Sequence, residues 1–329
     1  MKIAITGATG SLGSHLVRHF SSRGHEIIAL GRSKKPPSAL LDAVSEYIRA
    51  DISTTVPRLE VDCCIHSAAL ASDRGLYERF YQVNVEGTER VFEAVRTPLF
   101  IHISSASIYD FSGHPIREDQ VDPDAILSNY GKTKWLAESF LQKQSQRRRS
   151  IVSLRPRAIY GTHDRVLLPR ILKLVRNNKI IIPGDGMIPI SMTHVSNLIT
   201  GIERVIEQQP KGFHAYNIAD ERTYLLREVI EQVIFGLHGK ILPVKEIPIR
   251  WIKSFVKMAD SLKIPISYSA QSIAYVTESM VLDLTKIKKQ LQYEAITDFD
   301  LELANILDWG NHIGIKKIRK AAANLPWTG

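Results

Sequence analysis

Tyr130 and Lys134 have the residue types and the spacing needed to transfer a proton. They lie four positions apart in a run of good helix formers, so a helix would place both side chains on one face. A phenol with a usual pKa of about 10 is a poor acid–base group at neutral pH. A neighbouring ammonium favours the phenolate and moves the phenol towards a useful range. Such a pair is also common on helix surfaces without any chemical role, so a second feature is needed.

A cluster of hydroxyl groups precedes this pair and supplies that feature. Ser104, Ser105 and Ser107 end an apolar run, and we predict a strand over Leu99–Ser104. Ligand sites in open α/β sheets form beyond the carboxyl ends of the strands. A serine there could donate a hydrogen bond to a substrate carbonyl beside Tyr130, so proton transfer to a carbonyl oxygen is the chemistry to expect.

A glycine-rich turn opens the chain and indicates a cofactor. Glycines at three-residue spacing directly follow the first predicted strand, Lys2–Thr6, and begin a helix. This arrangement lets the backbone turn tightly and lets a pyrophosphate approach the helix N-terminus. The residues that we expect to bind the dinucleotide here are Gly7, Thr9, Gly10, Ser11, Leu12 and Gly13.

The end of the second predicted strand bears on which dinucleotide binds. A carboxylate there would bind the ribose 2′-hydroxyl of NAD, whereas a basic residue would accommodate the 2′-phosphate of NADP. The strand ends in Gly31-Arg32, no acid follows, and Arg32 could form a charge-assisted fork with a phosphate. We therefore predict NADP(H) in preference to NAD(H). The alternative is that Arg32 faces water and the 2′-hydroxyl finds another partner.

The glycine turn, the serines and the Tyr–Lys pair can form one site only if a sheet positions them. The first half of the chain has the sequence pattern of such a sheet. Short β-branched runs alternate with helical patterns, which is typical of a parallel sheet covered by helices. The predicted strands are Lys2–Thr6, Glu26–Leu30, Tyr47–Ala50, Asp62–His66, Leu99–Ser104 and Ile151–Arg155, and the predicted helices are Leu12–Ser22, Glu78–Val95 and Tyr130–Gln144. We predict an α/β fold with a Rossmann-type, doubly wound parallel sheet.

A second, smaller domain is expected after Pro156, where longer helical patterns replace the alternation. The run Ala215–Ile218 has the pattern of a late strand that returns to the sheet, so the two domains interleave. Residues 1–160 and about 189–219 should form the dinucleotide-binding domain. Residues from about 161 to 188, together with 220–329, should form a mostly helical substrate domain.

The composition is that of an ordinary globular protein, with 329 residues, 44% hydrophobic and 23% charged. No apolar run is long enough to span a bilayer. Met1–Thr6 resembles a short strand more than a signal peptide. Cys63 and Cys64 are neighbours in a predicted strand, so their side chains should point to opposite faces and not bond each other. A reducing, cytoplasmic location is expected.

The net charge of +9 permits an acidic partner but does not identify one. The basic runs 147–149 and 316–320 are interpreted as solvated, and no nucleic-acid-reading motif occurs, so no nucleic-acid partner is expected. Residues 250–263 form a basic amphipathic pattern that could touch a membrane surface, although inward packing is the preferred interpretation. Histidines such as His15, His66 and His194 lack metal-ligand spacing, so no metal is predicted.

The glycine turn, the serines after the strand and the pair Tyr130 and Lys134 follow one another along the chain. In this order they resemble the extended short-chain dehydrogenase/reductase family of the epimerase/dehydratase superfamily, and the resemblance covers essentially the whole chain. The motifs that carry the resemblance are His66–Ala69, Asn84–Thr88 and Arg155–Gly161, together with Asp51. The resemblance implies a catalytic triad of Ser105, Tyr130 and Lys134, with Lys134 also binding the nicotinamide ribose. It also implies cofactor contacts at Asp51, Ile52, Ala68, Ala69, Asn84, Tyr130, Lys134 and Pro156. Homodimers formed through helices such as Glu78–Val95 and Trp135–Gln144 are frequent in the family.

The stretch from Arg155 to Gly186 is most similar to the branch of 3β-hydroxysteroid dehydrogenases and 2-alkyl-3-oxoalkanoate reductases. This implies hydride transfer between NADP(H) and a hydrophobic secondary alcohol, ketone or β-keto acyl compound. Two departures weaken the analogy. The loop 161–164 lacks the usual proline and glycine, and Ser196 replaces a frequent aspartate.

The same residues bear on other reactions of this family. Dehydratases carry Asp and Glu directly after the catalytic hydroxyl residue, where this chain has Ala106 and Ser107. A nucleotide-sugar 4-epimerase or reductase stays open, because Arg157, Arg165 and Arg250 could bind a diphosphate. A non-catalytic dinucleotide sensor is the other alternative.

Overall fold

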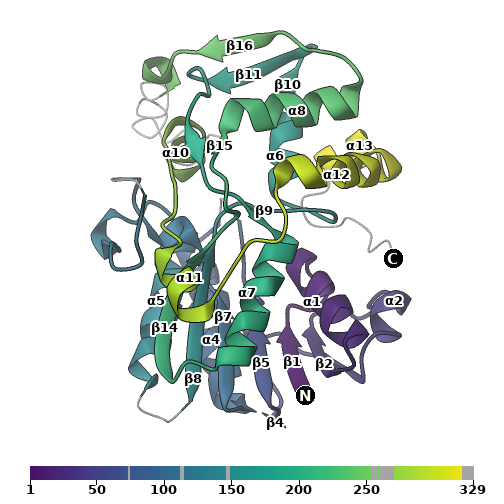
Figure 1. The fold of residues 1–329 in the computed structure, drawn as a ribbon, viewed down its shortest axis with the longest axis vertical. Helices are drawn as coiled ribbons and strands as arrows, with labels where there is room; N and C mark the ends of the chain where they lie inside the picture. Colours follow the sequence, from purple (N-terminus) through teal and green to yellow (C-terminus); the bar gives the residue numbers. More distant parts are fainter. Residues whose placement is uncertain (73–74, 112–114, 146–148, 253–257, 259–269, 321–329) are drawn as a thin grey trace.

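The computed structural model describes residues 1–72, 75–111, 115–145, 149–252, 258 and 270–320 (Figure 1). Seven of its strands form the main sheet in the order β14-β8-β7-β5-β1-β2-β3, in which every neighbouring pair is parallel. The strands are β1 (Lys2–Thr6), β2 (Glu26–Gly31), β3 (Glu46–Arg49), β5 (Cys63–His66), β7 (Leu99–Ile103), β8 (Ser150–Pro156) and β14 (Gly212–Ile218). The strand order reverses at β1, and the crevice at such a switch point is where dinucleotides bind. The predicted Rossmann-type sheet is confirmed.

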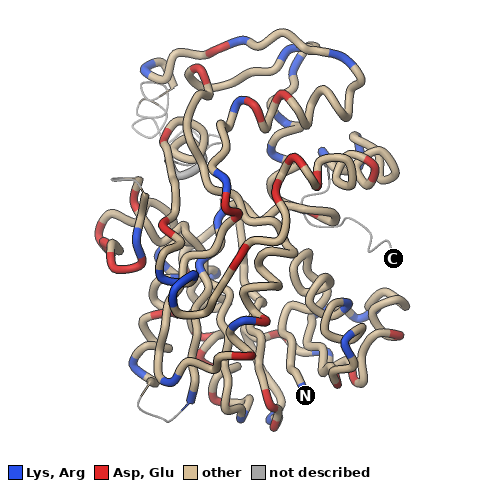
Figure 2. Tube along the Cα trace, viewed as in Figure 1, with Lys and Arg blue, Asp and Glu red and all other residues tan. Residues whose placement is uncertain are grey.

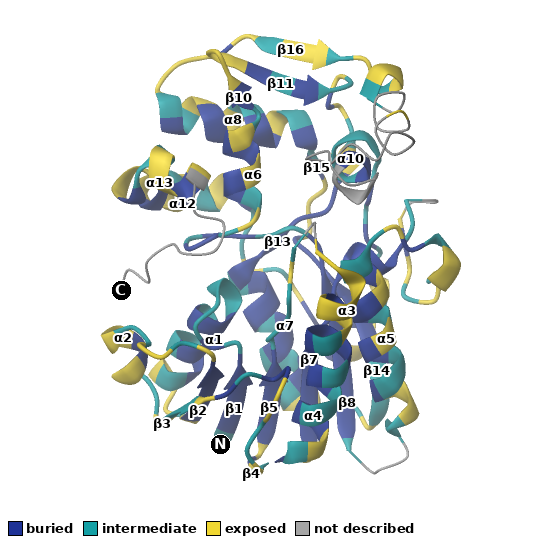
Figure 3. Ribbon diagram, turned by 180° about the vertical axis from the view of Figure 1, so that it is seen from behind, coloured by how far each residue is buried: buried dark blue, intermediate teal, exposed yellow. Residues whose placement is uncertain are grey.

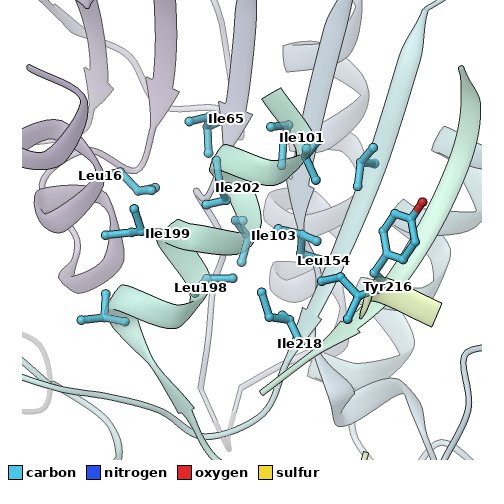
Figure 4. Close-up of a cluster of buried hydrophobic side chains, with 14 of the residues drawn as sticks. Leu16, Ile65, Ile101, Ile103, Leu154, Leu198, Ile199, Ile202, Tyr216 and Ile218 are labelled. Atoms are coloured by element: carbon cyan, nitrogen blue, oxygen red, sulfur yellow. The ribbon is translucent and has the colours of Figure 1, made fainter. Parts of the chain in front are cut away.

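Helices cover both faces of this sheet because successive side chains of a strand point to opposite sides. One face packs against α1 (Ser11–Ser22) and α7 (Val195–Gln208), as Figure 4 shows for Leu16, Ile199 and Ile202 over Ile65 and Ile101. The other face packs against α4 (Gly87–Ala94) and α5 (Asn129–Lys143). Figure 3 shows the central strands buried between these layers.

The two cysteines confirm the alternation. Cys63 belongs to the core on the α1 side and Cys64 to the core on the α4 side, and both thiols are free and buried. Burial raises the pKa of both thiols, that of Cys64 to about 12. Both side chains therefore act as small apolar core residues.

The helix predicted over Glu78–Val95 is interrupted. It consists of α3 (Tyr77–Phe80), the π-helical turn η1 (Tyr81–Glu86) and α4. Such π turns are rare and often occur at functional sites. The wider turn contains Asn84, one of the residues expected to contact the cofactor.

A second unit packs beyond the carboxyl edge of the sheet around its own core. Its helices are α6 (Leu167–Lys173), α8 (Leu226–His238), α10 (Ala270–Thr277), α12 (Phe299–Ile313) and α13 (Ile315–Lys320). Its three-stranded sheet comprises β10 (Val175–Arg176), β11 (Lys179–Pro183) and β16 (Val244–Ile247). The two-stranded pairings of β9 (Ile159–Tyr160) with β13 (Thr193–His194) and of β12 (Pro189–Ile190) with β15 (Tyr224–Leu225) lie in the segments that connect the units.

The packing of the chain differs from the expected domain boundaries in two segments. Ile190 and Met192, which we expected in the dinucleotide-binding domain, belong to the core of the second unit. We expected residues 220–329 in the second unit. Within them, α11 (Thr285–Leu291) packs on β14 and α7, and its Ile287 and Leu291 belong to the core of the large sheet. Apolar residues that return to the first core hold this segment there, so a two-domain division must assign α11 to the first domain.

The charged surface is mixed in sign. Figure 2 shows Lys and Arg in both units with Asp and Glu interspersed among them. Of the basic pattern at 250–263, residues 253–257 and 259–263 lie outside the described residues, as does the apolar run Ile264–Ile266, and Arg250 and Trp251 are exposed. Of the run 147–149, only Arg149 is described, and its guanidinium lies over the ring of Phe92. None of the helices within the described ranges combines the length and apolar character that a bilayer crossing requires.

Candidate active site

The glycine turn after β1 is shaped by close backbone contacts. Gly7 has a φ of +70° and packs so tightly on the loop after β5 that a Cβ would lie 2.9 Å from the backbone nitrogen of Ala68. A Cβ at Gly13 would lie 2.1 Å from the carbonyl oxygen of Gly7. Gly10 is the N-cap residue of α1, and no side chain at this position accepts a hydrogen bond from the first amides of the helix. These amides therefore point at the turn without a side-chain partner from the N-cap. This is the arrangement that accepts a phosphate at a helix N-terminus, and the residues present fit a dinucleotide.

The other residues expected at the cofactor lie around the same turn. Thr9 lies beside the end of β2, where a Cβ on Gly31 would be 3.3 Å from its hydroxyl. Arg32 follows that strand and is exposed. Asp51 follows β3. Burial acts to raise the pKa of its carboxyl, but hydrogen bonds from Ser53 and the positive charge of Arg32 outweigh burial and lower it. Arg32 and Asp51 are therefore close enough to influence each other at the rim where the adenine ribose would lie.

The loop after β5 is held by buried polar contacts. The amide of Ala68 donates to the Thr6 hydroxyl at 3.1 Å, and the amide of Leu70 donates to the Asn84 side-chain oxygen at 2.7 Å. The Asn84 amide in turn donates to the Thr133 hydroxyl on α5 at 3.1 Å. Asn84 is fully buried, so in this structure it ties the loop to α5 rather than pointing at open space. Ala69 belongs to the same loop, Ile52 is buried beside Asp51, and Pro156 ends β8 at this edge of the sheet.

Ser105 and Tyr130 are brought together at the carboxyl edge of the sheet. Ser105 is the second residue after β7 and caps the short helix η2 (Ala106–Ile108) by accepting from the amide of Ser107 at 3.1 Å. The side chain of Tyr130, at the start of α5, is hydrogen bonded to that of Ser105. Burial raises the pKa of Tyr130 to about 12, while this hydrogen bond and the charge of Arg170 act to lower it. Without further help the phenol is therefore a weaker acid than in water.

Gly131 explains how α5 reaches the serine turn. A Cβ at this position would lie 2.2 Å from the carbonyl oxygen of Ser107 and 3.0 Å from its carbonyl carbon. Both are backbone atoms, so the helix could not approach η2 this closely with any larger residue. Gly131 thus sets the distance between Tyr130 and Ser105. We did not infer this role from the sequence, in which the only indication was a glycine next to a tyrosine at the start of a helix.

Lys134 is one turn further along the same helix and is only 1% exposed. Its Nζ donates to the carbonyl oxygen of Ile103 at 2.6 Å and lies 3.0 Å from Nε2 of His102. Burial lowers the pKa of Lys134 to about 7, and the Glu138 carboxylate acts in the opposite direction. Burial also holds the pKa of His102 well below its usual value. A neutral His102 can therefore accept a hydrogen bond from the Lys134 ammonium.

Two further side chains border this cluster and were not predicted as catalytic neighbours. The Tyr275 hydroxyl on α10 hydrogen bonds to Ser107, whose hydroxyl accepts from that of Ser105 at 2.9 Å. The Arg157 guanidinium lies 5.3 Å from the centre of the Tyr275 ring. Arg165, from the loop after β9, instead points to the carbonyl oxygen of Thr9 at 3.5 Å. The three arginines that we considered as diphosphate ligands therefore lie in different places. Arg157 is beside Tyr275, Arg165 is at the glycine turn, and Arg250 is on the exposed surface.

The loop 161–164, which departs from the family pattern, packs on α1. His15 contacts the carbonyl oxygen of Thr162 at 2.9 Å, and the Arg18 guanidinium lies 3.2 Å from His163. The Asp164 carboxylate accepts from the first amides of α6, including Leu168 at 2.6 Å. The loop therefore joins the glycine-turn helix to the second unit. Within the described ranges, no three His, Cys, Asp or Glu side chains gather in a way that could hold a metal.

The sheet, the turn at its switch point and the Ser–Tyr–Lys cluster at the same edge define an NAD-binding protein of the oxidoreductase and epimerase class. Residues 3–219 match the NAD dependent epimerase/dehydratase family, and the chain belongs to that family. The resemblance to extended short-chain dehydrogenases/reductases is confirmed.

Three similar proteins illustrate the range of this family. An uncharacterized Escherichia coli protein, YbjS, is 24% identical over 94% of this chain and 97% of its own length. The 2-alkyl-3-oxoalkanoate reductase of Stenotrophomonas maltophilia is 28% identical over 71% of this chain and 75% of its own. The solved structure of MoeE5 in complex with UDP-glucose and NAD has a TM-score of 0.74 and 22% identity, and covers 95% of this chain and 99% of that one.

Proposed function

We propose that the protein is an NADP(H)-dependent reductase that transfers hydride reversibly between the cofactor and a hydrophobic secondary alcohol, ketone or β-keto acyl compound. The observation that carries this proposal is the hydrogen-bonded order Ser107–Ser105–Tyr130 beside a buried Lys134. The similarity to a 2-alkyl-3-oxoalkanoate reductase over most of the chain supports it.

Ser105, Tyr130 and Lys134 have different tasks in the proposed proton transfer. The bound cofactor supplies the hydride for the carbonyl carbon. Ser105 donates a hydrogen bond that orients the carbonyl oxygen. Tyr130 gives its proton to that oxygen as the alcohol forms, and the charge of Lys134 stabilises the tyrosinate that remains. In the reverse direction the Tyr130 oxygen takes the proton back.

The cofactor preference rests on the rim of the glycine turn. Arg32 is exposed at the end of β2, where no acid follows, and so can reach a 2′-phosphate. Gly7, Gly10 and Gly13 would admit the pyrophosphate, and Lys134 would also hold the nicotinamide ribose. Asp51, with a carboxyl that is ionised at neutral pH, would lie on the adenine side.

The absence of acid–base carboxylates argues against dehydration. Ala106 and Ser107 stand where a dehydratase would have its acid and base, and Ser107 is engaged with Ser105 and Tyr275. Epimerisation of a nucleotide sugar is the second candidate, favoured by the fold that the chain shares with MoeE5. A panel assay separates the two. NADPH oxidation should be seen with oxoacyl, sterol or aromatic ketones, whereas turnover of a UDP-, GDP- or dTDP-sugar without ketone reduction would overturn the proposal.

A cytoplasmic homodimer is the state that we propose for the enzyme. Tyr81 and Leu136, in the helices expected at the dimer interface, are exposed, and so are Leu76 and Tyr77 just before the first of these helices. Covering them in a dimer would remove apolar surface from water. Sedimentation of the purified protein tests this directly.

A further inference from the structure

Arg157 is a buried cation without an anionic partner among the residues that the structure describes. Its side chain is 6% exposed, and its Nε has no hydrogen-bond partner. In the part of the chain that the structure describes, no carboxylate lies within ion-pair distance of it. Its guanidinium lies over the face of the Tyr275 ring. A cation–π contact offsets only part of the free energy that burying an ion costs.

Arg157 also lies at the edge of the sheet where the proposed chemistry occurs. It directly follows β8, and Ser105 is the second residue after β7. These strands are parallel neighbours with Ile103 opposite Leu154. The backbone of Arg157 is fixed there, since its amide donates to the Thr193 hydroxyl at 3.1 Å. The next residue, Ala158, has a φ of +44°, a conformation that a non-glycine residue adopts at a cost.

A continuous series of contacts joins the guanidinium to the proton-transfer residues. Arg157 lies over the Tyr275 ring, the Tyr275 hydroxyl bonds Ser107, and Ser107 bonds Ser105. Tyr275 also acts on the Tyr130 hydroxyl and raises its pKa, whereas the charge of Arg170 acts to lower it.

We propose that Arg157 binds a carboxylate of the substrate, carried near the carbonyl that is reduced, so that the enzyme acts on the free 3-oxo or 3-hydroxy acid rather than on its ester. This inference rests on the proposed reductase function. A guanidinium pairs with a carboxylate through two parallel hydrogen bonds, and removal of both groups from water makes the pairing selective. A neutral ester would leave the cation buried and unpaired, a penalty that discriminates strongly between substrates.

The test compares 3-hydroxyoctanoate with its methyl ester, oxidised with NADP⁺ by the intact enzyme. The wild-type kcat/KM should be higher for the acid than for the ester. Arg157→Gln should lower the value for the acid by about 10²-fold and leave that for the ester nearly unchanged, as expected for loss of a charge-assisted pair. Arg157→Lys keeps the charge without the fork and should be intermediate. Arg222→Gln is the control, because it removes an exposed arginine paired with Asp300.

A folding measurement excludes a merely structural role for Arg157. The variant Arg157→Gln should be as stable as the wild type or more stable in the absence of ligand, since an unpaired buried charge is removed. A lowered melting temperature in both Arg157 variants would mean that the guanidinium supports the fold, and would contradict the inference.

Calorimetry on cofactor-loaded protein keeps the two proposals separate. Binding of 3-hydroxyoctanoate that is lost in Arg157→Gln, without any oxidation by the wild type, would support the carboxylate site and overturn the reductase. Oxidation of acid and ester at equal rates, unaffected by Arg157→Gln, would overturn the carboxylate site and support the reductase. Arg157-dependent binding of UDP-glucose without binding of the acid would assign Arg157 to a diphosphate and overturn the inference.

Discussion

The amino group of Lys134 lies 3.0 Å from Nε2 of His102, a histidine on the strand that leads to Ser105. His102 stacks on His66 of the next strand, with ring centres 5.5 Å apart, and His66 contacts the Thr6 hydroxyl at 2.8 Å. Polar side chains thus form a buried layer beneath the site, from β1 across β5 and β7 to α5. The layer fixes the position of the lysine, and its burial makes Lys134 easy to deprotonate.

The stability of the cofactor-free protein should reveal this burial. Burial lowers the pKa of Lys134 from 10.5 to about 7, so between these values the folded protein binds fewer protons than the unfolded chain. The free energy of unfolding is therefore highest above the unfolded pKa of 10.5, where Lys134 is neutral in both states. It decreases as the pH falls towards about 7, because the ammonium is disfavoured by burial in the folded protein. Lys134→Met should therefore gain stability relative to the wild type as the pH is lowered from 10 to 7, by about 1.4 kcal/mol for each step of one in pH. Urea unfolding at several pH values measures it, and a pH-independent difference would contradict the buried ammonium.

His102 should control the pH dependence of catalysis through Lys134. The wild-type kcat/KM for reduction should fall above the lysine pKa of about 7, where the ammonium is lost. His102→Leu removes an acceptor from the ammonium, so the fall should begin at lower pH. In His102→Gln the side-chain oxygen can accept instead, and the profile should return towards that of the wild type. Superimposable profiles for all three proteins would show that His102 has no influence on the lysine.

Gly131→Ala should separate Tyr130 from Ser105. The new methyl group would meet the Ser107 backbone at 2.2 Å, so α5 must shift. We expect kcat/KM to fall at least tenfold and the free energy of unfolding to fall by about 1–3 kcal/mol, the usual cost of overpacking. Lys132→Ala changes an exposed residue of the same turn and serves as the control. Wild-type activity and stability in Gly131→Ala would mean that the close approach is not needed.

The parts of the site that local patterns encode were predictable from the sequence. The glycine spacing, the four-residue spacing of Tyr130 and Lys134 and the serines after a strand each lie within one short segment. Most strands of the sheet were placed to within a residue or two, because burial on both faces gives the central strands nearly continuous apolar runs. The late strand β14 begins three residues before the predicted start, at Gly212 rather than Ala215. The π turn at Tyr81–Glu86 has no comparable signature, and its pattern matches that of an ordinary helix.

The residues that sequence reasoning missed depend on contacts between distant segments. His102 contacts Lys134 on α5, and Gly131 packs against the backbone of Ser107 in η2. Tyr275 is hydrogen bonded to Ser107, which lies 168 positions away in the chain. Arg157 was considered only as one of several scattered arginines, because the lack of a partner for a buried cation becomes visible only after folding. The position of α11 on the first core has the same cause, since its apolar face could have packed against either unit.

Cofactor choice should depend on Arg32. NADPH should bind more tightly than NADH, and Arg32→Ala should narrow that difference by about tenfold or more through loss of a charge-assisted contact, with NADH affinity unchanged. Lys34→Ala, an exposed neighbour, should leave the ratio nearly as it is. Titration of both cofactors by fluorescence measures the ratios. Equal affinities in the unmodified protein would refute the preference for NADP(H).

Hydride transfer to a ketone can be followed directly with a deuterium atom. Methyl 3-oxooctanoate and 3-oxooctanoate are incubated with NADPH deuterated at the transferable position of C4, and the products are analysed by mass spectrometry. Either ketone serves for this test, whichever of the two Arg157 favours. The proposed mechanism predicts a 3-hydroxy product with one deuterium at the former carbonyl carbon, and a rate that falls by about 10²–10⁴ in Tyr130→Phe while NADPH still binds. Turnover of a nucleotide sugar without deuterium transfer to either ketone, or full turnover in Tyr130→Phe, would contradict it.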